Sequence, residues 1–534
     1  MALESLLDPI ETTRPTVPSS VFVPGYRASG ILLHVTSLPS RHGIGGFGPE
    51  AFTWIDRLAD AGQTWWQILP IGPPDKGNSP YTPLSTFACN PLLISPEGLV
   101  DDGLLLENEC EVVDPFPDDH VDFDRVIHWK QELLARAFAN YRNNRRGLMT
   151  KLESEFRSFC EVQQRWLNDF ALFVALKQTF KDANYVNWPK GFLVREHGVL
   201  QSAVIELSME IERVKFDQFL VFRQLHRLRD HATRRGVKLF GDLPIFVSAD
   251  SADVWSHPDL FMLDEKKCPR FVAGVPPDYF SETGQLWGNP VYNWAALRAS
   301  GYAWWVDRLR SLMDLHDLVR LDHFRGFSAA WHVPADALTA VHGNWVDGPG
   351  SDFFLEVNRA LGGLPFVAED LGTITDDVRE LLAEFGFPKM GVLQFAFDGD
   401  LTNAFLPHYS VENMVTYTGT HDNDTSRGWY QTLPELHRKA FWEYLDETEG
   451  DEADVAWSMI ELAWGTQAAV TIAPMQDVLN RGGDARMNMP GIASGNWAWR
   501  CSEQEMRDAP WDQLRELTNR HQRTGVVQSL QRSV

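Results

Sequence analysis

Three acidic residues lie near the ends of short apolar segments rich in β-branched residues: Asp322 ends "LVRLD", Glu369 ends "PFVAE" and Asp422 ends "MVTYTGTHD". A retaining glycosidic transfer needs one carboxylate as nucleophile and one carboxylic acid as proton donor, about 5 Å apart across the scissile bond. Neighbouring strands of a sheet lie about 5 Å apart, so adjacent strands could present two of these acids in that geometry. Each acid alone could instead be a salt-bridge partner, and three acids converging on one rim weigh against that alternative.

The segment "VRLD" alternates apolar and charged residues. Successive side chains of a strand point to opposite faces, so Arg320 and Asp322 share one face while Val319 and Leu321 share the other. Arg320 beside Asp322 favours the ionised carboxylate, which suits a nucleophile. Nearby carboxylates should raise the pKa of Glu369, which suits a general acid. We therefore expect the charged face to point into a polar cavity and the apolar face into packed helices.

Histidines also lie near the ends of these segments, at His34, His323 and His421. A metal-dependent barrel hydrolase typically carries an HxH pair on its first strand, and the sequence contains neither HxH nor HExxH. Histidines among carboxylates more often hydrogen-bond the hydroxyls of a neutral substrate. No GxGxxG comes directly after an expected strand and no P-loop is present. We therefore expect no metal and no cofactor.

The acids must be positioned by eight short apolar runs, most of them separated by helical patterns. Eight such units predict an α/β fold, a (β/α)8 TIM barrel, with a doubly wound parallel sheet as the alternative. The polar residues fall late in their runs, which favours the barrel, because catalytic residues gather at the C-terminal rim of barrel strands. The expected strands cover residues 30–38, 64–71, 237–247, 318–324, 365–370, 391–397, 414–422 and 468–477.

Two connections are too long for simple crossovers, which predicts insertions into the barrel. We expect a largely helical subdomain at about residues 75–236 and a lid over the barrel mouth at about residues 250–300. The lid contains "GVPPDYFSETGQLWGNP", and a loop so rich in proline, glycine and aromatics is typical of a substrate clamp. An irregular N-terminal arm (1–27), the catalytic barrel (28–500) and a C-terminal tail (501–534) complete the expected organisation.

Composition and charge exclude several classes of partner. The net charge of −25 argues against nucleic acid and against an anionic membrane surface, because both require a basic footprint. No stretch is apolar for long enough to span a bilayer, and the N-terminus lacks the features of a targeting segment. The five cysteines are dispersed and form no CxxC pair, which favours a reducing, cytoplasmic location. The 20 tryptophans, several of them in glycine-rich loops, hint at sugar rings as ligands.

Motifs along most of the chain resemble those of one enzyme family. In order they are "NSPYTPLSTFACNP", "GDLPIFV", "GQLWGNP", "VRLDHFRG", "AEDLG", "YTGTHDNDT", "ARMNMPG" and "GNWAWR". Together they resemble the 4-α-glucanotransferases known as amylomaltase or disproportionating enzyme, which are allied to the α-amylases. The resemblance extends from about residue 28 to residue 500 and implies a barrel without the C-terminal β-domain of α-amylases.

The resemblance implies transfer of α-1,4-glucan segments between malto-oligosaccharides, or fragments of starch or glycogen, with retention of configuration. Asp322 matches the nucleophile, Glu369 the acid/base and Asp422 a third carboxylate that favours the distorted sugar. Other positions match residues that bind substrate around the reacting glucose or in the lid. These are Tyr81, Asp242, Asp278, Gln285, Trp287, Arg320, His323 and His421.

The sequence departs from the family pattern around Tyr81, where Thr82 replaces a frequent glutamine and Cys89 a frequent glycine. Contacts to the donor glucan should therefore differ there. Two alternatives remain open from the residues alone. One is an α-amylase-like retaining hydrolase, in which water takes the place of the acceptor. The other is a glucan-binding scaffold without turnover, against which the presence of all three acids argues.

Overall fold

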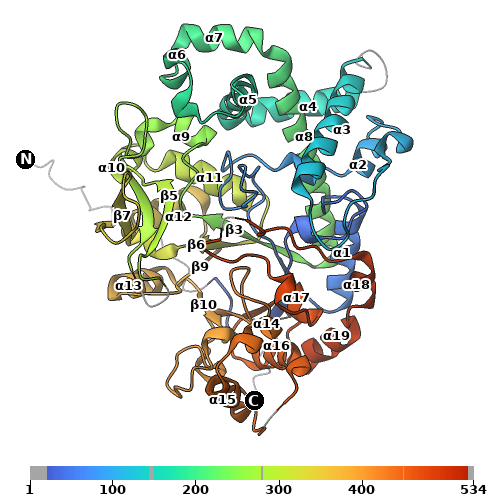
Figure 1. Ribbon diagram of the computed structural model, residues 1–534, viewed down its shortest axis with the longest axis vertical. Coiled ribbons are helices and arrows are strands. Elements are labelled where there is room, and N and C mark those ends of the chain that lie inside the picture. The colour runs from blue at the N-terminus through green and yellow to red at the C-terminus, as the bar shows by residue number, and fades with distance from the viewer. Residues whose placement is uncertain (1–20, 144–149, 278–280, 449, 493, 527–534) are drawn as a thin grey trace, which may run out of the picture.

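The computed structural model describes residues 21–143, 150–277, 281–448, 450–492 and 494–526 (Figure 1). Its centre is a sheet of eight parallel strands in the order β10-β11-β12-β1-β2-β3-β6-β9. The two outer strands approach each other, since the amide of Ala368 at the end of β9 donates to the carbonyl of Pro388 just before β10 at 3.0 Å. The strands are β1 (Ala28–Leu32), β2 (Trp65–Gln67), β3 (Lys238–Pro244), β6 (Leu318–Asp322), β9 (Phe366–Ala368), β10 (Lys389–Val392), β11 (Met414–Tyr417) and β12 (Val470–Pro474).

This nearly closed sheet confirms the predicted (β/α)8 barrel over the doubly wound alternative. Each of the eight expected strands overlaps one observed strand, but the observed strands are shorter. Strand hydrogen bonding ends before the predicted strand ends at the C-terminal rim. For example, 3₁₀ turns begin at Val35 and at Leu393, inside two of the expected strands. Every residue of β1 and β12 is buried, as parallel strands covered on both faces require.

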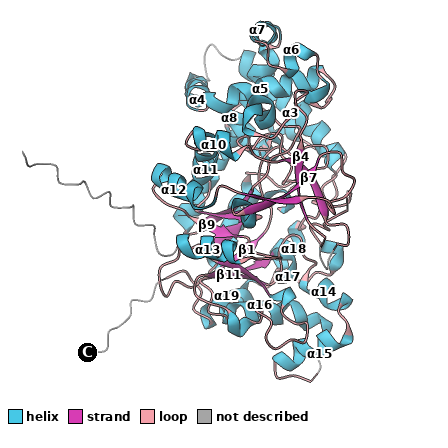
Figure 2. Ribbon diagram, turned by 90° about the vertical axis from the view of Figure 1, so that its left-hand side faces the viewer, coloured by secondary structure: helices cyan, strands magenta, loops and turns pink. Residues whose placement is uncertain are grey.

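Helices surround the barrel and bury one apolar side against it (Figure 2). In α1, for example, Trp54, Ile55 and Leu58 are buried, and Pro49 occupies the first turn, where its missing N–H costs nothing. The helices packed along the barrel and its loops are α1 (Pro49–Asp60), α9 (Ala252–Ser256), α10 (Trp294–Ala299), α11 (Ala303–Met313), α12 (Gly350–Leu361), α13 (Asp376–Phe385), α14 (Ser426–Thr432), α15 (Glu435–Tyr444), α16 (Val455–Gly465) and α17 (Met475–Val478).

The long segment between β2 and β3 is mostly helical and forms the upper part of Figure 1. Aromatic side chains hold its helices together: the ring of Phe216 stacks on that of Tyr141 with centroids 4.3 Å apart, and Phe156 meets Phe216 edge-on at 5.3 Å. Its helices are α2 (Pro96–Asp101), α3 (Phe123–Asn143), α4 (Thr150–Val162), α5 (Gln164–Thr179), α6 (Lys190–Leu193), α7 (His197–Glu206) and α8 (Ser208–Arg235).

Helix α8 also forms side-chain hydrogen bonds with the loop that follows β2. The side-chain amide of Gln218 accepts from the N–H of Cys89 at 2.9 Å and donates to the carbonyl of the same residue at 2.8 Å. Gln224 repeats this arrangement with Ser95, at 2.6 and 3.2 Å. Buried backbone groups need such partners, so the inserted helix supplies the hydrogen bonds that the loop cannot make internally.

A second, antiparallel sheet has the strand order β5-β4-β7-β8. Its strands are β4 (Phe271–Val275), β5 (Gln285–Pro290), β7 (Ala329–Pro334) and β8 (Asn344–Asp347). Strands β4 and β5 lie in the segment expected to form the lid, whereas β7 and β8 follow β6. The sequence analysis did not predict this sheet. In Figure 2 its strands β4 and β7 stand beside the barrel strands.

The chain after residue 500 packs against the barrel through α18 (Glu503–Asp508) and α19 (Trp511–Arg520). Arg523 is fully buried, and its guanidinium donates to the carbonyls of Trp464, Thr466 and Ala468. This end of the chain therefore stabilises the face of the barrel where the strands begin. Within the described residues, no helix combines the length and apolarity needed to cross a membrane.

Candidate active site

Asp322 and Glu369 lie side by side at the C-terminal rim. Leu321 of β6 pairs with Ala368 of β9, so the next residue along each strand occupies neighbouring positions. The backbone N–H groups of His323 and Leu371 donate to the two carboxyl oxygens of Glu369, at 2.8 and 2.9 Å. Burial raises the pKa of Glu369 to about 7; the Asp322 charge adds to the rise, while Arg320 and the two N–H groups oppose it. Glu369 therefore keeps its proton to a higher pH than an ordinary glutamate.

Arg320 connects the acids of two neighbouring strands. Its Nη1 lies 2.9 Å from both carboxyl oxygens of Asp242 on β3, and its Nη2 lies 2.8 Å from Oδ1 of Asp322. Burial alone would lower the pKa of this guanidinium, but the Asp242 and Asp322 carboxylates raise it well above its usual value. The fork of the guanidinium thus fixes the orientation of Asp322 and leaves one of its oxygens free of Arg320.

A second group of side chains at the mouth consists of Tyr81, His421 and Asp422. The Tyr81 hydroxyl donates to Oδ2 of Asp242 at 2.8 Å, and the Tyr81 ring stacks on His421 with centroids 5.0 Å apart. Nε2 of His421 lies 3.3 Å from Oδ2 of Asp422. Burial opposes the charge on both partners, yet the attraction between them raises the pKa of His421 and holds that of Asp422 well below its usual range.

The second sheet places two of the expected lid residues against this site. The Trp287 ring meets the ring of His323 edge-on, with centroids 4.8 Å apart, and its Nε1 donates to Oε1 of Gln285 at 3.1 Å. His323 adopts a left-handed backbone conformation with φ of 53°, which turns the chain sharply after Asp322. Asp278, the third expected lid residue, lies outside the described residues.

Residues near the C-terminal motif complete the site, and the sequence analysis did not single them out. Nδ2 of Asn488 donates to Oδ1 of Asp422 at 2.6 Å, and Arg486 donates to the backbone carbonyl of Asp422 at 2.6 Å. The Trp497 ring lies 5.7 Å from Tyr81 and 6.0 Å from His421. The quoted motifs "ARMNMPG" and "GNWAWR" contain all three residues, and that was the signal available in the sequence.

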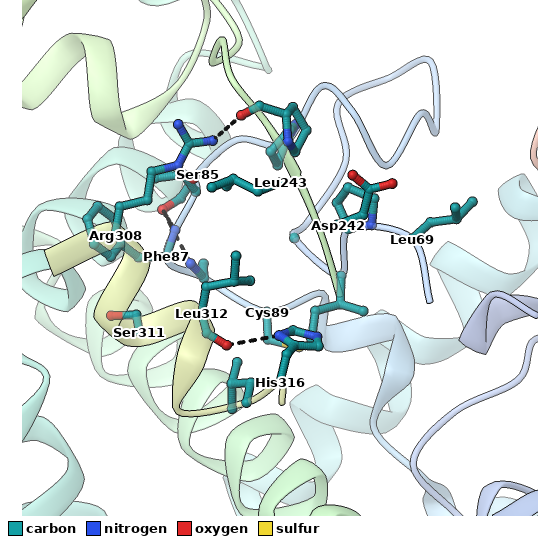
Figure 3. Close-up of a pocket in the computed structure, with 18 of the residues that line it drawn as sticks. Leu69, Ser85, Phe87, Cys89, Asp242, Leu243, Arg308, Ser311, Leu312 and His316 are labelled. Carbon is teal, nitrogen blue, oxygen red and sulfur yellow. Dashed lines mark hydrogen bonds between the residues drawn. The ribbon is translucent and has the colours of Figure 1, made fainter. Parts of the chain in front are cut away.

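A separate cavity of about 50 Å³ is lined by Asp242 and by the loop that carries Phe87 and Cys89, among other residues (Figure 3). Most of its lining is apolar. His316 is paired with the carbonyl of Leu312 at 2.9 Å, and the terminal nitrogens of Arg308 bond the carbonyls of Pro244 and Ile245. These two polar side chains are therefore already paired within the protein. In the described residues no group of three or more His, Cys, Asp or Glu side chains is placed to hold a metal.

Comparison with known proteins identifies the family. Residues 33–505 match the family described as 4-alpha-glucanotransferase. The chain belongs to the 4-alpha-glucanotransferase family. Among curated 4-alpha-glucanotransferases, that of Synechocystis is 48% identical over 485 residues, which cover 90% of this chain and 95% of the relative. That of Thermus thermophilus is 44% identical over 508 residues, which cover 93% and 99%.

The structural neighbours agree with this assignment. The amylomaltase from Streptococcus agalactiae, solved in complex with acarbose, superposes with a TM-score of 0.89 at 35% identity, covering 93% of this chain and 99% of that one. The 4-alpha-glucanotransferase family therefore defines the reaction as glucan transfer, a hexosyl transfer, and the hydrolase alternative is not favoured.

Proposed function

We propose that this protein transfers α-1,4-glucan segments by a retaining double displacement, with Asp322 as nucleophile, Glu369 as acid/base and Asp422 as stabiliser of the transition state. The observation that carries the proposal is the side-by-side position of Asp322, at the end of β6, and Glu369, directly after β9. Arg320 pairs with Asp322, and burial raises the pKa of Glu369 to about 7. Retaining enzymes require one ionised and one protonated carboxyl group about 5 Å apart, which residues at neighbouring strand ends can supply.

In the first half-reaction, a carboxylate oxygen of Asp322 attacks the anomeric carbon of the donor. The bond from that carbon to the glycosidic oxygen breaks, and the Glu369 carboxyl group gives its proton to the departing oxygen. The products are a glucosyl ester of Asp322, a shortened glucan with a new 4-hydroxyl group and an ionised Glu369. The high pKa of Glu369 makes it an effective proton donor near neutral pH.

In the second half-reaction, ionised Glu369 removes the proton from the 4-hydroxyl group of an acceptor glucan. The acceptor oxygen attacks the anomeric carbon and the ester bond to Asp322 breaks, which restores both acids. Trp287 and Gln285 lie at the mouth beside His323, and we assign them, together with Asp278, to binding the acceptor and excluding water. Transfer then prevails over hydrolysis because the acceptor occupies the space that water would need.

The remaining polar groups surround the reacting sugar. We assign Tyr81 as the aromatic platform under that sugar and Asp242, Arg320, His323 and His421 as groups that bind its hydroxyls or hold the acids in place. Tyr81 and His421 support this role by offering stacked rings at the mouth beside Asp422. Neutral hydroxyls are suitable partners for this mixture of carboxylates and imidazoles.

The proposed substrates are malto-oligosaccharides and fragments of starch or glycogen. The acarbose complex of the Streptococcus agalactiae amylomaltase supports an α-glucan of this kind. We also propose a cytoplasmic location, supported by five cysteines that all remain free thiols in the described residues. The proposed catalytic unit spans residues 28–500, and residues 250–300 contribute the lid.

Incubation of the purified protein with maltotriose tests the proposal. Glucose, maltopentaose and a ladder of longer chains are expected, whereas glucose and maltose alone would indicate water as the acceptor. Asp322→Asn, Glu369→Gln and Asp422→Asn should each lower kcat by several orders of magnitude with an unchanged circular dichroism spectrum. Near-normal turnover in any of these variants would contradict the role of that residue.

A further inference from the structure

Asn488 reaches the site from a segment far along the chain from Asp422. Residues 486–490 follow β12 and α17 along the chain, and local hydrogen bonds fix their course. Nε of Arg486 donates to the carbonyl of Asn488 at 2.7 Å, and the amide of Trp497 donates to the carbonyl of Met487 at 2.8 Å. The side chain of Asn488 is thus held on a structured segment.

The carboxylate of Asp422 is held by one donor at each oxygen. Nδ2 of Asn488 lies 2.6 Å from Oδ1, and Nε2 of His421 lies 3.3 Å from Oδ2. The shorter of the two contacts is therefore the one made by Asn488. The Asp422 side chain remains 46% exposed, so its other lone pairs face the open mouth, where a sugar hydroxyl can donate to them.

The backbone that carries Asp422 is fixed by other residues. Asp477, buried after β12, accepts from the hydroxyl of Thr418 at 2.6 Å and from the amide and hydroxyl of Ser426 at 2.7 Å, one residue at each end of the loop. Arg486 bonds the carbonyl of Asp422 itself. Removal of the Asn488 side chain therefore leaves the loop in place and releases only the rotation of the Asp422 carboxylate.

We infer that Asn488 is a positioning residue for glucan transfer, which fixes the Asp422 carboxylate in the orientation that the distorted sugar requires. The inference rests on the proposed role of Asp422. Because Asp422 acts mainly in the transition state, the loss of Asn488 should lower kcat and leave KM nearly unchanged. A misplacement of about 1 Å in a catalytic group costs about 100-fold in rate, which sets the expected size.

Asn488→Asp supplies a readout that a merely structural role would not change. Aspartate has the shape of asparagine, but its ionised form places a second negative charge beside Asp422 and removes the donor. Protonation of the pair at lower pH restores a donor between the two carboxyl groups. The ratio of variant to wild-type kcat, measured on maltotriose at each pH, should therefore rise as pH falls. A ratio independent of pH would overturn the inference.

A double-mutant cycle with Asp422→Asn separates the possibilities. Asn488→Leu alone should lower kcat by about 100-fold, and Asn488→Leu in the Asp422→Asn background should lower it less than twofold further. Asn496 bonds the backbone of Met489 and Ile492 in the turn after Asn488, and in the described part of the chain it has no hydrogen bond to Asp422. Asn496→Ala is therefore the matched control. Its effect on kcat should add to that of Asp422→Asn.

The outcomes distinguish this inference from the proposed function. Full activity of Asp422→Asn would remove the assigned role of Asp422, and with it the basis for Asn488. An inactive Asp422→Asn together with normal kcat in Asn488→Leu, or with fully additive losses in the double variant, would overturn the inference and leave the role of Asp422 intact.

Discussion

Replacement of Glu369 by glutamine should make the stability of the protein less sensitive to rising pH. Burial raises the pKa of Glu369 from 4.5 to about 7 in the folded protein. Between these values the folded chain keeps a proton that the unfolded chain releases, so the wild-type protein loses stability as pH rises through the folded pKa. Linkage gives a loss of about 2 kcal/mol from about pH 5.5 to about pH 8.5.

The free energy of unfolding of the wild-type protein and of Glu369→Gln, measured in urea at a series of pH values, tests this loss of stability. Glutamine leaves one of the two N–H groups, of His323 or Leu371, without an acceptor, but that cost does not depend on pH. The change in the difference between the two proteins therefore reports the ionisation of Glu369, including its interaction with Arg320 and Asp322. A difference that stays constant over this pH range would show that Glu369 ionises normally and would refute the physical basis of its role as acid.

Two further predictions follow from the contacts at the mouth. Trp287→Ala should raise the ratio of hydrolysis to transfer severalfold, because the indole beside His323 no longer excludes water. The ratio of glucose release to chain elongation measures this effect. An unchanged ratio would contradict water exclusion by the lid. Arg320→Lys should destabilise the fold by about 2 kcal/mol, because one ammonium group cannot bond both Asp242 and Asp322. Its unfolding midpoint should fall together with kcat, and wild-type values for both would exclude the bridging role.

The sequence predicted the barrel and the rim acids because both depend on local patterns. Apolar runs of strand length mark buried parallel strands, and the alternation of "VRLD" places Arg320 and Asp322 on one face. The structure indeed joins them at 2.8 Å. Only the strand ends were displaced, since the point at which a chain leaves a ladder depends on contacts with its neighbours.

Features that depend on long-range contacts were not predicted. In the second sheet β4 pairs with β7, although β6 lies between them in the sequence. The sequences of these short strands do not clearly alternate apolar and polar residues, which is the pattern that predicts a strand. Asn488 likewise meets Asp422 across 66 residues of chain, and nothing in "ARMNMPG" itself indicates which side chain it approaches. Asp477 is the last residue of the expected strand over residues 468–477, but its pairing with Thr418 and Ser426 depends on the folded loop.

The hydrogen bonds between α8 and the loop after β2 also imply an order in which parts of the chain fold. Gln218 and Gln224 bond residues that precede them by 129 positions, so the loop is synthesised long before its anchors exist. Tyr81, in the same loop, meets Asp242 and His421, which lie 161 and 340 positions further along the chain. During synthesis, the long-range hydrogen bonds that hold this loop therefore form only after the ribosome has completed the helical insertion.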